Sequence, residues 1–401
     1  MGNKKKWIAW TVVIVLITNI LTFVVSNAIS LYLPNGKVII GQQQYADILK
    51  FQKMYQVKDL LNKYYDGKID DTALEEGAVK GMTAALNDPY TTFMNKKEFQ
   101  DFNSQTEGNY SGVGLQVQAK DDKILVVDVF EDSPAKKAGI LPKDEIVKVN
   151  GKDVTGKELD KAVTMMKGQD GTDVTLTIYR AAEGTFDKKL KRAKINMVTV
   201  KGEMLENNIG YINVSMFDDN TAKNFSDKLK ELKGKGMKTL IVDLRGNPGG
   251  LLDECVDMVS NFVPKGKVIV STIDKYNNKK EYNSKGGDYT NLPLVVLTNE
   301  GTASASEIFS GAVRDYKIGT LVGTKTFGKG VVQTIIDTGN GTALKVTISK
   351  YYTPNGENIH HIGIKPDVEV AYPEELLKKP YDRSTDPQFT KALQLAREKV
   401  K

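Results

Sequence analysis

Short apolar runs alternate with helical patterns between residues 189 and 350. The runs are rich in aliphatic and β-branched residues, which is typical of buried strands. They lie at residues 209–214, 239–244, 292–297 and 321–322. Between them, residues 220–232 and 251–263 repeat apolar positions at helical spacing. This alternation predicts an α/β core in which helices pack against a sheet.

Residues 41–106 show helical periodicity and no strand pattern. Their apolar stripe consists of Phe51, Tyr55, Leu60, Leu61, Tyr64 and Tyr65. We expect this stripe to be part of a core, with a dimer surface as the alternative. A capping box at residues 72–75 predicts a helix over residues 73–86, and the sequence NDPY at residues 87–90 predicts the turn that ends it.

An apolar run at residues 7–25 follows three lysines at positions 4–6. A run of this length can span the hydrocarbon core of a bilayer as a helix. The lysines predict that the amino terminus stays in the cytoplasm, so we expect a single-pass anchor in the cell membrane with the rest of the chain extracytoplasmic. The alternative is a cleaved signal peptide, because residues 26–28 (SNA) resemble a cleavage site; the protein would then be secreted.

Composition and charge exclude several classes of function. The net charge of +6 over 401 residues is modest, and no nucleic-acid motif occurs, so we expect no nucleic-acid partner. The single cysteine, Cys255, rules out an internal disulfide, and we interpret it as a buried helix residue. The two histidines, His360 and His361, are adjacent and lack a third metal ligand or a clear orienting acid. We therefore expect no metal and no cofactor, and a Ser–His–Asp triad is the weaker alternative for any serine chemistry.

Two short motifs carry the candidate chemistry. GTASASE, residues 301–307, opens a helical pattern after a strand-like run, which puts its serines among free backbone N–H groups. FGKG, residues 327–330, places Lys329 between two glycines. A serine needs a base to become a good nucleophile, and lysine serves as that base only where burial lowers its pKa by roughly three units. The pair predicts a Ser–Lys site, with Gln333 on the same face of the chain as Lys329.

A second motif overlaps the lysine. GTKTFGK at residues 323–329 matches the start of a phosphate loop. Gly330 follows, where a Ser or Thr would bind Mg²⁺, and the next residues predict a strand where a helix is required. We therefore discount nucleotide binding.

GTASASE followed by TFGKGVVQ resembles the carboxyl-terminal processing peptidases, also called tail-specific proteases. The resemblance covers nearly the whole chain after the first apolar run. It implies that Ser304 is the nucleophile and that Lys329 and Gln333 are its partners. It also implies a core of the crotonase and Clp protease architecture.

The glycine-rich sequence RGNPGG, residues 245–250, lies between a predicted strand and a predicted helix. One interpretation is a tight turn. The other is an oxyanion hole, in which the N–H of Gly249 or Gly250 acts with that of Ala305 on a tetrahedral intermediate. The family pattern favours Gly250 weakly, and the choice between the two glycines stays open.

Residues 108–180 resemble a PDZ domain of the bacterial protease type. In such a domain a peptide's carboxyl terminus adds a strand beside residues 115–117, while loop N–H groups bind the carboxylate. The residues assigned to this site are Gly112, Val113, Gly114, Leu115, Val163 and Met166.

Near the carboxyl end, Asp386-Pro387 predicts a helix start, with Asp as the N-cap. The apolar stripe of this helix is formed by Phe389, Leu393 and Ala396, and it packs either on the core or on a second subunit.

Together these patterns predict a membrane-anchored serine endopeptidase that acts on proteins or peptides with accessible carboxyl-terminal tails. The expected parts are a cytoplasmic stub and anchor, a helical region, a PDZ domain, the α/β core and a carboxyl-terminal helical region; they span residues 1–30, 41–107, 108–182, 189–375 and 376–401. A catalytically silent PDZ scaffold and a crotonase-like acyltransferase are the alternatives. The complete set of Ser304, Lys329 and Gln333 argues against the scaffold, and the PDZ domain argues against the acyltransferase.

Overall fold

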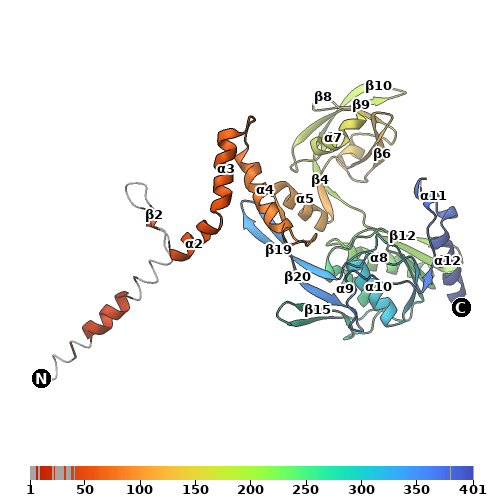
Figure 1. Cartoon of the computed structure of the whole chain (residues 1–401). Coiled ribbons are helices and arrows are strands. Elements are labelled where there is room, and N and C mark those ends of the chain that lie inside the picture. The colour runs from red at the N-terminus through yellow and green to blue at the C-terminus, as the bar shows by residue number, and fades with distance from the viewer. Residues whose placement is uncertain are drawn as a thin grey trace. The chain divides into compact units, whose positions relative to one another are not determined.

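The computed structural model of the chain describes residues 6–7, 10–19, 22, 31–32, 38–39, 41–379 and 381–400 (Figure 1). The chain divides into two compact units, Met1–Ala78 and Val79–Lys401. The division falls inside helix α4 (Asp71–Ala84), and not at residue 107, where the predicted helical region ends. Strand β3 (Thr92–Met94) and helix α5 (Lys96–Thr106) therefore belong to the second unit.

The first unit contains helices α2 (Gln42–Lys50) and α3 (Gln52–Tyr64) and a short pair of strands, β1 (Leu31–Tyr32) and β2 (Val38–Ile39). The expected membrane span, residues 7–25, lies partly outside the described residues. Where the structure does describe the chain, it contains no helix that is long and apolar enough to cross a membrane.

The apolar stripe of α3 is exposed in this chain, so the expectation that it belongs to a core is wrong. Five of the six stripe residues are exposed, from 42 % at Phe51, just before the helix, to 69 % at Tyr64, and Leu61 is half-buried. No residue of α2 or α3 is buried. Helices of nine and thirteen residues have too little surface to close a core on their own.

Helix α4 begins at Asp71, and its cap is Asp70 rather than the predicted Thr72. The Asp70 carboxylate accepts hydrogen bonds from the N–H groups of Thr72 and Ala73 at 2.9 and 3.2 Å. Aspartate is as good an N-cap as threonine, so a sequence with several candidates in a row leaves the first turn ambiguous.

The PDZ domain is an antiparallel sheet in the order β10-β9-β7-β6-β5, with β8 paired to β7. Its strands are β5 (Leu115–Lys120), β6 (Lys123–Val129), β7 (Glu145–Val149), β8 (Lys152–Asp153), β9 (Asp173–Arg180) and β10 (Gly184–Lys191). Helices α6 (Pro134–Lys137) and α7 (Leu159–Met166) and the 3-10 turn η1 (Gly156–Glu158) complete the domain. The sheet therefore continues past the predicted boundary at residue 182. Strand β5 lies at its edge, which is the position that β-augmentation requires.

A two-stranded ribbon joins the PDZ domain to the core. It pairs β4 (Asn109–Gly112) with β11 (Ala193–Asn196) in antiparallel register.

The core contains a six-stranded sheet in the order β12-β13-β14-β17-β18-β21. Its strands are β12 (Val200–Leu205), β13 (Ile209–Val214), β14 (Thr239–Asp243), β17 (Leu294–Thr298), β18 (Gly319–Gly323) and β21 (Val368–Glu369), and the turn η2 (Glu206–Asn208) joins the first two. The strands from β13 to β21 are parallel, and β12 is antiparallel to β13. The strands predicted from the apolar runs all occur here, with ends shifted by one or two residues.

Helices cover both faces of this sheet. Helices α8 (Thr221–Gly234), α9 (Leu252–Ser260) and α10 (Ala305–Asp315) lie on one face, and α12 (Pro387–Lys399) lies on the other. Phe309 of α10 shares a buried cluster with Leu240 of β14, whereas Phe389 of α12 shares one with Ile241. Adjacent residues of β14 thus face opposite layers, as the period-two geometry of a strand requires. The predicted α/β core is confirmed, and the stripe of α12 packs on the core.

A second sheet carries the predicted lysine motif at one end. Its order is β16-β15-β20-β19, and β3 pairs with β20. The strands are β15 (Val268–Asp274), β16 (Lys279–Asn283), β19 (Val331–Gly339) and β20 (Thr342–Tyr352). Strand β19 begins two residues after Lys329, so the strand predicted for this segment, which argued against a phosphate loop, is present. Helix α11 (Glu374–Leu377) and the turn η3 (Arg383–Thr385) precede α12.

Candidate active site

Ser304 is the N-cap residue of α10, in the turn between β17 and the helix. Its φ of 56° and ψ of −116° lie in a region that residues other than glycine rarely adopt. Hydrogen bonds hold this turn, because the Ser304 carbonyl accepts from the Ile308 N–H at 3.0 Å and from the Tyr351 hydroxyl at 3.1 Å. The half-buried Ser304 hydroxyl makes no cap hydrogen bond. The side chain is therefore not serving as a helix cap.

The carboxylate of Glu307 binds the turns of both motifs. Oε2 accepts hydrogen bonds from the backbone N–H groups of Ser304 and Lys329 at 2.9 and 2.8 Å. Oε1 accepts the hydroxyl of Thr326 at 2.6 Å and the N–H of Gly328 at 2.8 Å. The Glu307 side chain is fully buried, and burial raises its pKa while the four donors oppose that rise. This acceptor brings the backbones of the predicted nucleophile and the predicted base together.

The amine of Lys329 is half-buried beside the ring of Tyr90, with 4.7 Å between Nζ and the ring centroid. Within the part of the chain that the structure describes, no hydrogen bond or ion pair reaches this amine. Its pKa is lowered to about 8, first by burial and then by the charge of Lys345, whereas Asp88 and Glu307 oppose the shift. An amine with this pKa is partly neutral near pH 7.5, as a general base must be.

Gln333 lies on β19 opposite Thr347 of β20. Its side-chain Nε2 donates to the Thr347 hydroxyl at 3.3 Å. The Thr347 N–H in turn donates to the hydroxyl of Thr91 at 3.1 Å. Among the described residues nothing donates to Oε1 of Gln333, so this oxygen is left without a donor.

The N–H groups of Gly250 and Ala305 have no acceptor among the described residues, whereas that of Gly249 donates to Oδ1 of Asn247 at 2.9 Å. Both glycines have positive φ, 101° at Gly249 and 140° at Gly250. A Cβ at Gly249 would come within 2.8 Å of Ser304 Cβ and 2.9 Å of Ala305 N, so only glycine allows this approach. The hydrogen-bond pattern thus leaves Gly250, rather than Gly249, as the available donor beside Ala305.

Two asparagines fix this glycine-rich loop against the turn before α10. The carbonyl of Asn247 accepts from the Ala303 N–H at 2.9 Å. Oδ1 of Asn299 accepts from the N–H groups of Gly246 and Gly301 at 2.8 and 3.0 Å.

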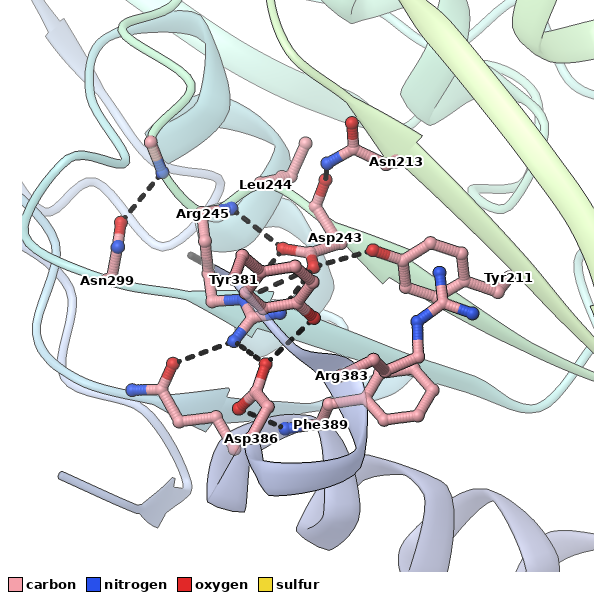
Figure 2. Close-up of polar contacts among 12 residues, drawn as sticks. Tyr211, Asn213, Asp243, Leu244, Arg245, Asn299, Tyr381, Arg383, Asp386 and Phe389 are labelled. Carbon is pink, nitrogen blue, oxygen red and sulfur yellow. Dashed lines mark hydrogen bonds and ion pairs between the residues drawn. The ribbon is translucent and has the colours of Figure 1, made fainter. Parts of the chain in front are cut away.

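Figure 2 shows the ion-pair network around Arg245, at the start of the same loop. Its guanidinium binds Asp243 and Asp386 with closest approaches of 2.7 Å to each. Asp386 is the N-cap of α12, where its Oδ1 accepts from the Phe389 N–H at 3.0 Å. The hydroxyl of Tyr211 donates to Asp243 at 2.8 Å. The carboxyl-terminal helix therefore anchors the loop that carries Gly249 and Gly250.

The cysteine and the histidines take no direct part in this arrangement. Cys255 is fully buried in α9, its thiol donates to the Ala305 carbonyl at 2.9 Å, and burial raises its pKa. The interpretation of Cys255 as a buried helix residue is confirmed. Nδ1 of His360 accepts from the Gly330 N–H at 3.3 Å, and burial lowers the pKa of this imidazole. The described residues contain no group of side chains that would hold a metal ion.

The predicted peptide-site residues lie around the edge strand and α7 of the PDZ domain. Leu115 and Val163 are half-buried and pack against the domain's core. Met166 is only 4 % exposed, and Gly112 is paired with Ala193 in the β4–β11 ribbon. The remaining two, Val113 and Gly114, are buried in the link between β4 and β5.

Three further residues reach the site, and sequence reasoning missed their roles. Glu307 lies inside GTASASE and Arg245 begins RGNPGG, but neither was assigned a role in the site. Tyr90 was placed in a turn before the next domain. The sequence offered two signals for these roles: an acid among small and apolar residues in GTASASE, and an aromatic residue in NDPY. Local periodicity cannot show which distant residues such side chains contact.

Comparison with known proteins covers almost the whole chain. The sequence profile of Peptidase family S41 matches residues 208–370, that of the PDZ domain matches residues 111–197, and that of the activating protease CtpB N-terminal domain matches residues 34–98. Carboxy-terminal processing protease CtpA of Bacillus subtilis (strain 168) is 40% identical over 363 residues, which are 90% of this chain and 78% of that protein. A proposed CtpA-like serine protease of Staphylococcus haemolyticus (strain JCSC1435) is 38% identical over 377 residues, 93% of this chain and 75% of that protein.

A solved structure supports the fold. The crystal structure of a proposed S41 protease from Bacteroides fragilis NCTC 9343 has a TM-score of 0.54 and 18% identity, and the match covers 83% of this chain and 92% of that one. The α/β core, the PDZ domain and these relatives define a serine-type peptidase. The chain belongs to peptidase family S41, among the carboxy-terminal processing proteases, which confirms the resemblance seen in the two motifs.

Proposed function

We propose that the protein is an endopeptidase with a Ser–Lys dyad, in which Ser304 is the nucleophile, Lys329 is the general base and Gln333 orients the base. The observation that carries this proposal is the shared acceptor, Oε2 of Glu307, which draws the backbones of Ser304 and Lys329 together. The Lys329 amine is half-buried and has a lowered pKa, as a general base requires. The Ser304 hydroxyl makes no cap hydrogen bond and can therefore act as the nucleophile.

The chemistry proceeds through an acyl-enzyme. A change of side-chain torsion brings the Lys329 amine to the hydroxyl of Ser304 while the amine stays beside the Tyr90 ring, and Oε1 of Gln333 accepts one amine hydrogen. As Oγ attacks the scissile carbonyl, its proton passes to the amine and the carbonyl oxygen becomes negative. The N–H groups of Gly250 and Ala305 bind that oxyanion. The ammonium then protonates the leaving amine, and a water activated by the same lysine hydrolyses the ester.

The PDZ domain is proposed to recognise the carboxyl terminus of the substrate. Strand β5 is an edge strand, and Val163 of α7 lies half-buried on the domain's core. A tail that adds to β5 gives main-chain hydrogen bonds, and the terminal carboxylate meets the N–H groups at residues 112–114. Unstructured tails are favoured because a folded segment cannot supply an extended strand.

The cellular setting is a separate proposal. The apolar run at residues 7–25 and the preceding lysines support a membrane anchor with the peptidase outside the cytoplasm. Digestion by a protease added to intact spheroplasts would support this topology, and full protection would contradict it. The exposed stripe of α3 supports a homodimer, which sedimentation of wild-type and Tyr55→Ser, Leu60→Ser protein would test.

The direct test of the dyad is cleavage of an unstructured protein such as β-casein by the purified full-length chain. Ser304→Ala and Lys329→Ala should each remove nearly all cleavage and leave the circular dichroism spectrum unchanged. Lys325→Ala is the matched control, because Lys325 is an exposed lysine in the same loop and should be dispensable. Substantial cleavage by folded Lys329→Ala protein would instead favour a different base, and no cleavage by any variant or wild type would favour the silent PDZ scaffold.

A further inference from the structure

The ring of Tyr90 lies beside the Lys329 amine, although Tyr90 comes from a segment far away in the sequence. The amine lies over the ring face, 4.7 Å from the centroid. The ring of His360 approaches the same tyrosine at 6.3 Å between centroids, at an angle of 55°. The Tyr90 hydroxyl has no hydrogen-bond partner among the described residues. The contact with the lysine is therefore made by the ring and not by the hydroxyl.

The turn that carries Tyr90 is fixed to the hairpin behind the site. Oδ1 of Asp88 accepts the Tyr90 N–H at 3.0 Å, and Oδ2 accepts the Thr91 hydroxyl at 2.6 Å. The Thr91 hydroxyl oxygen accepts the N–H of Thr347, whose own hydroxyl accepts from Gln333. One residue of β20 thus sets the positions of Tyr90 and Gln333 relative to each other. Such a connection is unnecessary for a ring that only fills space.

We propose that Tyr90 is a positioning residue for the base: its ring face receives the Lys329 ammonium that forms when Ser304 is deprotonated. The inference rests on the proposed role of Lys329 as the general base. An aromatic face attracts a cation through its quadrupole and holds it without a hydrogen bond. The lysine keeps its three protons free for Gln333 and the leaving group, and the ring excludes water from one side of the amine.

The charges around the Lys329 amine are compatible with a cation on the Tyr90 ring. Asp88 and Glu307 favour the ammonium, and Lys345 disfavours it. Burial and these two carboxylates raise the pKa of Tyr90, so its phenol stays neutral over the pH range in which the lysine titrates. The ring is therefore an uncharged cation acceptor throughout catalysis.

Tyr90→Phe and Tyr90→Leu separate the ring face from simple packing. The assay is the pH–rate profile for β-casein cleavage by the full-length chain. Phenylalanine keeps the face, so kcat at every pH should stay within about twofold of wild type. Leucine stays apolar but loses the face, so the plateau kcat should fall about tenfold with KM little changed, and the rising limb should move to lower pH by roughly half a unit. A wild-type plateau in Tyr90→Leu, or a loss in Tyr90→Phe as large as in Tyr90→Leu, would overturn the proposal.

A series of fluorinated phenylalanines at position 90 provides a second test in case the Tyr90→Leu variant does not fold. Phenylalanine with one, two or three ring fluorines at position 90 has nearly constant shape but a progressively weaker negative face. The logarithm of kcat should fall steadily with fluorine number, and a flat series would overturn the proposal. Lys329→Ala in the same assay keeps the two hypotheses apart: retained activity there rejects the dyad, whereas an inactive Lys329→Ala with unchanged Tyr90→Leu rejects only the role of Tyr90.

Discussion

The backbone N–H groups of Ser304 and Lys329 donate to the same atom, Oε2 of Glu307, at 2.9 and 2.8 Å. The two residues belong to different elements, the start of α10 and the turn before β19. A single buried carboxylate therefore sets the distance between the Ser304 turn and the Lys329 turn. If either turn moves, it must break its hydrogen bond to Glu307 or the Glu307 side chain must move with it. The relative position of the two turns therefore depends on Glu307.

Glu307→Gln should damage catalysis more than substrate binding. The amide keeps the shape of the carboxylate but turns its NH₂ group toward two of the four donors, and those donors lose their acceptor. We expect kcat to fall at least tenfold with KM within about threefold, and the free energy of unfolding to fall by about 1–3 kcal/mol. Glu300→Gln, an exposed acid near the same loop, is the control and should behave as wild type. Wild-type kcat and stability in Glu307→Gln would contradict this role.

The pH dependence of cleavage should report the lysine. Because the base acts when neutral, kcat/KM should rise with pH and level off above an apparent pKa of about 8. The charge of Lys345 lowers this pKa, so Lys345→Met should raise it and move the rising limb to higher pH. At pH 7.5 the variant should be slower than wild type, with the difference closing toward pH 10. Lys345→Arg keeps the charge, so the rising part of its pH–rate profile should stay in place. If the rising part moved to lower pH in Lys345→Met, the charge of Lys345 would not be what lowers the Lys329 pKa.

Gly249→Ala should remove nearly all activity. The residue has φ of 101°, and an added Cβ would lie 2.8 Å from both the Ala303 carbonyl oxygen and Ser304 Cβ. The side chain would displace the turn that holds the nucleophile and the N–H groups proposed to bind the oxyanion, so kcat should fall at least about 100-fold. Gly234→Ala is the matched control, since nothing lies within 4 Å of its added Cβ. Activity within tenfold of wild type in Gly249→Ala would show that the loop tolerates the change.

The elements of the core were predictable from sequence because burial imposes a local pattern. Residues 209–214 and 239–244 are apolar on both faces, as strands between two helical layers must be. The proposed dyad was also accessible from sequence, since Ser304 and Lys329 lie in two short motifs. The proposed role of Tyr90 was not accessible, because it depends on pairing between β3 and β20. The stripe of α3 was misassigned for a related reason: periodicity shows that one helix face is apolar and does not show what covers it.

Asp386→Ala should destabilise the core and disturb the glycine-rich loop, residues 245–250, from a distance. Asp386 is fully buried, caps α12 and binds Arg245, whose guanidinium would be left with Asp243 as its remaining carboxylate partner. Removing one partner of a buried ion pair costs about 3–5 kcal/mol, which should appear in urea unfolding. Asp382→Ala, an exposed acid a few residues earlier, should unfold as wild type does. Equal stabilities of the two variants would mean that the network in Figure 2 contributes little.

Tail recognition should depend on a free carboxylate and on α7. Amidating the carboxyl terminus of a peptide substrate should weaken its binding at residues 112–114. Val163→Asp should weaken it in the groove that we propose between β5 and α7. The two changes act at one site, so their combined effect should be smaller than the product of the separate effects. Lys161→Asp, on an exposed position of the same helix, controls for added charge. Equal cleavage rates for free and amidated tails by intact enzyme would rule out this groove as the tail receptor.

Labelling with a fluorophosphonate, which phosphonylates activated serines, tests the dyad most directly. Mass spectrometry of the digested protein then identifies the modified residue, and the labelling rate can be followed against pH without any substrate tail. We expect one adduct, on Ser304. Its rate of formation should rise with pH and level off above an apparent pKa of about 8. Lys329→Ala should label at least 100-fold more slowly. An adduct on another serine, or wild-type labelling of Ser304 in Lys329→Ala protein, would contradict the assignment of Ser304 and Lys329 as nucleophile and base.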